Sequence, residues 1–192
     1  MSNTRGRFTI TGGMLLAAML ILSGFSDTMA AGTEIPKEGL PLIGEMQQGD
    51  TVCHVVLDND TELDFAEVSV KHGRQEEWPV NLLPEEEVFA AGEKQILFYD
   101  IREAEKAQAD YYESGGAEPD EPLQTPYYCI RFTDGGGNEY ELHRFPFGDT
   151  EEGTIRLTDG TLWLEYRSTA SGELVKTLEA EKAVAERKES NG

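Results

Sequence analysis

The amino-acid sequence predicts an all-β domain, an antiparallel β-sandwich of about seven to eight strands, with a partly open β-barrel as the alternative. Short runs of alternating or β-branched apolar residues recur through the middle of the chain. Clusters of Gly, Asp and Asn separate these runs, as expected for tight turns between strands. Helical spacing is confined to residues 102–112 and to the C-terminal tail.

Residues 1–30 have the order of a secretory signal peptide. Basic residues precede the apolar run Met14–Leu22, and the small residues Thr28 and Ala30 predict cleavage before Ala31. The run is much shorter than the roughly 20 apolar residues that cross a bilayer, so a cleaved signal is favoured over a retained anchor. The expected location is therefore secreted, or extracellular, with no stable membrane insertion after cleavage.

The first half of the β domain follows an extended lead-in. Residues 31–49 are rich in Pro and Gly, which prevents a long regular element. The domain itself is expected at residues 50–169, and its first half predicts two hairpins, 51–57 with 65–71 and 87–90 with 95–99.

The second half of the domain predicts two further hairpins, 126–132 with 140–145 and 154–157 with 162–167. The second of these is joined by Asp159-Gly160, a dipeptide suited to a two-residue turn.

Two polar segments interrupt or follow the β pattern. Residues 101–125 predict a mobile acidic insertion that begins with a polar helix and continues with Gly, Pro and acidic residues. Residues 170–192 predict a charged tail that forms a short docked helix or a frayed end.

The charge balance restricts the class of partner. The chain has 16 Lys and Arg against 37 Asp and Glu, a formal net charge of −21. A field of this sign repels phosphates, so nucleic acids and anionic membranes are excluded as expected partners. Solubility outside the cell is the first interpretation of this charge, and cation binding is the second.

Cys53 and Cys129 each lie in an apolar, strand-like run. In an exported protein this pattern predicts one disulfide. Closing a loop of that length stabilises a fold by roughly 4–5 kcal/mol in the chain-entropy account. Two buried free thiols are the alternative.

The segment Tyr127-Tyr128-Cys129, with Cys53 and Trp78 upstream, resembles the second-cysteine region of immunoglobulin variable domains. The resemblance implies an Ig-like sandwich. Trp78 departs from the family pattern because it lies much farther from the first cysteine and beside Pro79.

A second set of residues is similar to uncharacterised small secreted β-domain proteins of gut-type anaerobic bacteria, mainly over residues 51–145. The matching residues are Asn59-x-Thr61, Phe65-x-x-Val68-x-Val70, Trp78, Asn81-Leu82-Leu83 and Phe89-x-Ala91-Gly92-Glu93. Members usually have Gly after the Thr, where this chain has Glu62. The resemblance implies fold and export, and it supplies no catalytic residue.

Four carboxylates, Asp58, Asp60, Glu62 and Asp64, occupy alternate positions in the first acidic turn. In an extended turn such spacing places oxygen ligands on one side, as a calcium site requires. The spacing does not fit an EF-hand loop. A solvated acidic turn is the alternative, and no other cofactor is expected.

Motifs of catalysis are absent from the sequence, which has no HExxH, CxxC or GxSxG pattern. We assign no catalytic residue, although paired carboxylates leave a hydrolase as an alternative. Trp78 beside Pro79 is the candidate ligand contact, since aromatic side chains often anchor partners. The resulting hypothesis is a non-catalytic secreted binding or accessory module for an extracellular protein or glycan, with a calcium-stabilised structural module as a further alternative.

Overall fold

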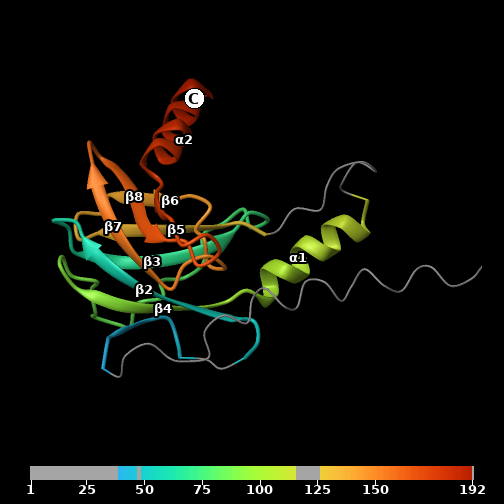
Figure 1. Cartoon of the computed structure of the whole chain (residues 1–192), viewed down its shortest axis with the longest axis horizontal. Coiled ribbons are helices and arrows are strands. Elements are labelled where there is room, and N and C mark those ends of the chain that lie inside the picture. The colour runs from blue at the N-terminus through green and yellow to red at the C-terminus, as the bar shows by residue number, and fades with distance from the viewer. Residues whose placement is uncertain (1–38, 47–48, 116–125, 192) are drawn as a thin grey trace, which may run out of the picture. The chain divides into compact units, whose positions relative to one another are not determined.

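The computed structural model describes residues 39–46, 49–115 and 126–191, and within them it contains nine strands and two helices (Figure 1). The expected signal peptide at 1–30 lies outside the described residues, and so do much of the lead-in and residues 116–125 of the insertion.

The strands form two sheets. The larger sheet has the order β1-β4-β2-β7-β8-β9 and the smaller has the order β3-β5-β6. The larger contains β1 (Leu42–Ile43), β4 (Lys94–Asp100), β2 (Val52–Asp60), β7 (Glu152–Thr158), β8 (Thr161–Arg167) and β9 (Leu174–Lys176). The smaller contains β3 (Phe65–His72), β5 (Tyr128–Asp134) and β6 (Glu139–Leu142). Helix α1 (Arg102–Glu113) follows β4, and α2 (Leu178–Asn191) follows β9.

The mostly β, two-sheet prediction is confirmed, and among the described strands neither sheet closes into a barrel. The smaller sheet is antiparallel throughout, but the larger sheet is mixed because β1 pairs with β4, and β2 with β7, in parallel. Between β2 and β7 the chain passes through β3 in the smaller sheet, β4 in the larger sheet, and β5 and β6 in the smaller sheet. Strand β7 then returns beside β2 and pairs with it in parallel. The Ig-like arrangement stays a prediction.

Two of the four expected hairpins are present. Strands β5 and β6 pair antiparallel with Ile130 opposite Leu142, and β7 pairs with β8. The β7–β8 turn has φ of 52° at Asp159 and 79° at Gly160. Two consecutive positive φ values define the turn whose twist matches that of paired strands.

The other two hairpins are wrong. Strands β2 and β3 follow each other in sequence but lie in different sheets. Of residues 87–90, only Phe89 pairs with a strand, through an isolated bridge to Phe65. A short polar turn between two β-branched runs is compatible with a hairpin and also with a crossing between sheets, so local pattern does not separate them.

The buried side chain of Asn59 fixes this crossing. Asn59 is 0% exposed at the end of β2, and its amide donates to the carbonyls of Leu63, Phe89 and Ala90 at 2.9, 3.0 and 3.1 Å. The Thr61 hydroxyl donates to Asn59 Oδ1 at 2.6 Å. These bonds hold the turn after β2 against the segment before β4, which directs the chain into the smaller sheet.

The main core lies between the sheets. Cys53, Val55 and Leu57 face it from β2, while Tyr128 and Ile130 face it from β5. Because successive strand residues point to opposite faces, Cys129 and Arg131 point away from the core, to what we call the outer face of the smaller sheet.

The predicted disulfide is wrong in this structure, since Cys53 and Cys129 are both free. Cys53 packs against the core, whereas Cys129 is buried on the outer face of the smaller sheet. Tyr128 occupies the core position that a bridging cysteine on β5 would need. The alternative of two free thiols therefore holds.

Replacing Asn59 by Ala should destabilise the protein by about 2–4 kcal/mol, because a fully buried amide that donates to the carbonyls of Leu63, Phe89 and Ala90 is removed. Chemical denaturation measures the change. The matched control is Asn138→Ala in the exposed β5–β6 turn, where the loss should stay below about 1 kcal/mol. Equal effects at the two sites would contradict the structural role of Asn59.

The free thiols give a second prediction. Unfolded protein treated with an alkylating agent in the absence of reductant should gain two adducts, seen by intact mass. In the native state alkylation should be slow, because burial raises the pKa of the Cys53 thiol to about 11 and also raises the pKa of Cys129. Unfolded protein that gains adducts only after reduction would establish a disulfide instead.

Candidate functional site

An open groove of about 560 Å³ lies between the outer face of the smaller sheet and helix α2. Its lining comes from the start of β5, the residues after β6 and the second half of α2. These residues are Tyr127, Cys129, His143, Arg144, Val184, Arg187 and Lys188. We call this feature the cationic groove.

The charged residues that line the groove are basic, although the chain as a whole is strongly acidic. Arg144, Arg187, Lys188 and His143 contribute to its lining, and no carboxylate is among the described lining residues. In a chain with 37 acidic against 16 basic side chains, this local reversal requires an arrangement that keeps acids out of the groove surface.

Helix α2 forms one wall of the groove, and its first turn is tied to β8. The backbone N–H of Thr177 donates to the Leu164 carbonyl at 3.0 Å, and the Leu164 N–H donates to Thr177 Oγ1 at 2.9 Å. Thr177 directly precedes α2, and its carbonyl accepts the N–H of Glu181 at 3.0 Å. The helix therefore begins at a fixed point on the larger sheet.

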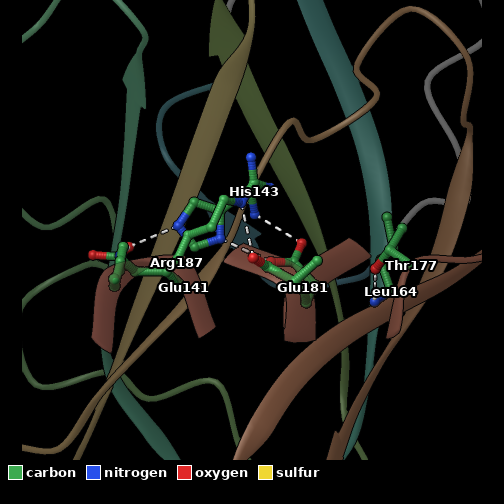
Figure 2. Close-up of polar contacts among 8 residues, drawn as sticks. Glu141, His143, Leu164, Thr177, Glu181 and Arg187 are labelled. Carbon is green, nitrogen blue, oxygen red and sulfur yellow. Dashed lines mark hydrogen bonds and ion pairs between the residues drawn. The ribbon is translucent and has the colours of Figure 1, made fainter. Parts of the chain in front are cut away.

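A charged cluster fixes α2 against the end of β6 through Glu181 in the first turn of the helix and Lys188 in its last turn. Figure 2 shows His143 between Glu141 and Glu181. Glu181, 5% exposed, accepts the backbone N–H of His143 at 2.9 Å and lies 2.7 Å from its Nδ1. His143 Nε2 lies 3.0 Å from Glu141, which also accepts from Lys188 Nζ at 2.6 Å. We call these four residues the helix clasp.

The clasp determines the charge of His143. Hydrogen bonds to Glu141 and then to Glu181 raise the pKa of His143 to about 9, although burial opposes the shift. The His143 hydrogen bond is the largest cause that lowers the pKa of Glu141, to about 2. At neutral pH the groove therefore contains an imidazolium.

The clasp also argues against a catalytic Cys–His pair at Cys129. Both ring nitrogens of His143 already contact carboxylates, so neither is free to take a proton from the thiol. Burial raises the pKa of Cys129, which disfavours the reactive thiolate. Glu141 and Glu181 face His143, so they do not form a free carboxylate pair for hydrolysis.

The rim of the groove is formed by Tyr127 and Arg144. The Arg144 guanidinium lies 5.4 Å from the centroid of the Tyr127 ring. Gly73 lies against the same ring, where a Cβ would come within 2.1 Å of Cζ, so only glycine fits there. Tyr127 is 44% exposed, and its ring contacts both the Gly73 backbone and Arg144.

The candidate contact residue Trp78 is half-buried and lies over the same outer face. Lys71 Nζ is 4.5 Å and Arg131 Cζ is 4.8 Å from its ring centroid. Both cations project from the smaller sheet, so Trp78 and the groove belong to one surface.

The four carboxylates of the first acidic turn have separate partners or none. Asp58 pairs with Lys94 at 3.4 Å, Asp60 pairs with Arg156, and Asp64 accepts the N–H of Ala91 at 2.8 Å. Glu62 is exposed. Within the described ranges no group of three or more His, Cys, Asp or Glu side chains has a metal-binding arrangement. Calcium binding at this turn stays a prediction without a ligand set to support it.

Sequence reasoning missed the groove. Nothing in the sequence pairs His143 with Glu181, which lies 38 residues farther along the chain in the C-terminal tail. The available signal was the alternation of β5, which places Cys129 outward, together with the adjacent cations Arg187 and Lys188.

Comparison of the chain with protein-family models, with curated proteins and with solved structures found no match. The helices in the described part of the chain include none long and apolar enough to span a membrane.

The clasp predicts that the docking of α2 weakens at alkaline pH. Because the pKa of His143 is raised from 6.5 to about 9, its contribution is complete below pH 6.5 and is lost as the pH rises through about 9. The ¹³Cα chemical shifts of α2, followed by NMR, should move toward coil values over that interval.

His143→Gln is the control for this titration, because Gln retains a donor but cannot carry the charge. Its α2 shifts should show no step over the same pH interval. A step of equal size in the variant would assign the titration to another group.

Proposed function

We propose that this protein is an exported, non-catalytic binding module that engages a negatively charged extracellular partner through the cationic groove. The observation that carries the proposal is the basic lining of the groove, which has four basic residues and no described carboxylate in a chain of net charge −21. Export rests on the signal-like sequence of residues 1–30.

The rest of the surface supports this assignment. Acidic side chains dominate the chain, so an anionic partner is repelled from most of the surface and attracted only where cations gather. The charge distribution thus selects both the site and the orientation of approach. It contributes more to the rate and specificity of association than to the final affinity.

The geometry of the cluster supports binding over catalysis. The acidic members of the clasp are used to hold α2, and His143 is held as an imidazolium between them. The Arg144 guanidinium at the rim is outside the clasp, and a guanidinium binds anions without taking part in proton transfer.

A thermal-unfolding panel tests the proposal. Polyanions such as polygalacturonate should raise the melting temperature of the purified protein, because a ligand that binds only the native state stabilises it by mass action, by about 2.7 kcal/mol at one hundred times its Kd. Neutral dextran should have no effect, and about 0.5 M salt should remove the shift by screening.

Arg144→Glu should abolish the shift, since it reverses the charge at the rim of the groove. Arg102→Glu is the matched control, because Arg102 is exposed at the start of α1, where an acidic residue is tolerated by the helix dipole. Stabilisation that survives Arg144→Glu, or that both variants lose equally, would contradict the groove as the binding site.

A further inference from the structure

We propose that the cationic groove continues along the outer face of the smaller sheet to Trp78, and that this extended track binds a carboxylated polysaccharide. The inference rests on the proposed function and adds to it the class of ligand and a second contact region. A sugar ring would lie on Trp78 while carboxylates along the polymer contact the cations between Trp78 and Arg144.

The track is continuous in the strand register. Lys71 on β3 lies directly opposite Cys129 on β5, and Cys129 lines the groove. Arg131 follows Cys129 by two residues on the same strand, so it projects from the same face. Lys71 and Arg131 both lie within 5 Å of the Trp78 ring centroid, at 4.5 and 4.8 Å.

The charge along the track favours an anionic polymer. Lys71 and Arg144 each contact an aromatic ring, and in the described part of the chain neither has a carboxylate within ion-pair distance. Arg131 pairs with Glu139 at 3.0 Å, and the side chain of Glu139 is 54% exposed. The two ends of the track therefore have cations whose charge is not compensated by a neighbouring acid.

Trp78 is suited to contact a sugar ring. Pro79 follows it, and the hydroxyl of Ser69 donates to the Val80 carbonyl at 3.5 Å, which holds this segment over the sheet. The Trp78 ring is half-buried, so part of its surface is exposed to solvent. Two cations that project from one sheet face contact the ring and fix its orientation. A fixed aromatic ring binds at a low cost in side-chain entropy.

An acidic peptide is disfavoured by the hydrogen bonds of β3. Extended peptides commonly bind by adding a strand to a free sheet edge. Next to Trp78 that edge is occupied, because the Val68 N–H donates to Asn81 Oδ1 at 2.9 Å and the Leu82 N–H donates to the Val68 carbonyl at 2.7 Å. A polysaccharide needs no backbone partner and binds through rings and carboxylates alone.

Tryptophan fluorescence provides a direct test. The chain has two tryptophans, Trp78 and the buried Trp163, which is 8% exposed. Titration with polygalacturonate should change the fluorescence of the wild-type protein. Trp163→Phe should retain that change, and Trp78→Phe should lose it while still binding.

Affinity measured by calorimetry completes the test, with polygalacturonate, dextran sulfate, neutral dextran and polyglutamate as probes. Trp78→Ala should weaken polygalacturonate binding about tenfold, as expected for a central aromatic contact. Trp78→Phe should restore most of the affinity because it retains a ring. Polyglutamate binding should be weaker in the wild type and change less than about twofold in Trp78→Ala.

The outcomes separate this inference from the proposed function. Wild-type affinity for polygalacturonate in Trp78→Ala, combined with loss of binding in Arg144→Glu, would overturn the track and leave the groove. Stronger binding of dextran sulfate or polyglutamate than of polygalacturonate would overturn the carboxylated polysaccharide as the ligand class. Absence of binding to all three polyanions would overturn both.

Discussion

The fold depends on one buried amide. Asn59 lies fully buried near the end of β2, and its side-chain amide donates to the carbonyls of Leu63, Phe89 and Ala90, which belong to two separate segments of the chain. By satisfying them, Asn59 joins the end of β2 to the segment before β4 and directs the intervening chain into the second sheet. The chain then passes through β4 in the larger sheet and through β5 and β6 in the smaller sheet before β7 pairs with β2 in parallel.

Side chains alternate between the two faces of a strand, and this alternation places the residues of the site on one surface. With Tyr128 and Ile130 turned inward, β5 presents Cys129 and Arg131 outward, and β3 places Lys71 beside them. The clasp adds α2 to this face and uses the acids Glu141 and Glu181 to do so. Because these acids face His143 in the clasp, the outer face of the smaller sheet exposes mainly cations beside α2, although it contains charges of both signs.

The sequence predicted what is local. The β5–β6 and β7–β8 hairpins follow from alternating runs around short turns, and the polar helix at 102–112 corresponds to α1. The crossing at Asn59 was not predicted, because an Asn in an acidic turn has the same local pattern in a hairpin. The predicted disulfide is wrong because the positions of two cysteines in a sequence do not specify the sheet face on which each one lies. The groove was missed because its two walls are distant in sequence. They are held together by ion pairs, and α2 has no apolar stripe that would indicate where it packs.

The docking of α2 has a consequence for the energetics of binding. Its most buried side chain is Glu181, while Leu178 and Val184 are only half-buried, so little apolar area holds the helix in place. Segments of this kind open independently of the core, with a free energy well below that of global unfolding. Since an open helix removes one wall of the groove, the apparent affinity of a ligand scales with the fraction of molecules in which the helix is closed. Salt therefore weakens the ionic contacts of the ligand, and it also lowers the fraction of molecules in which α2 is closed and the groove is formed.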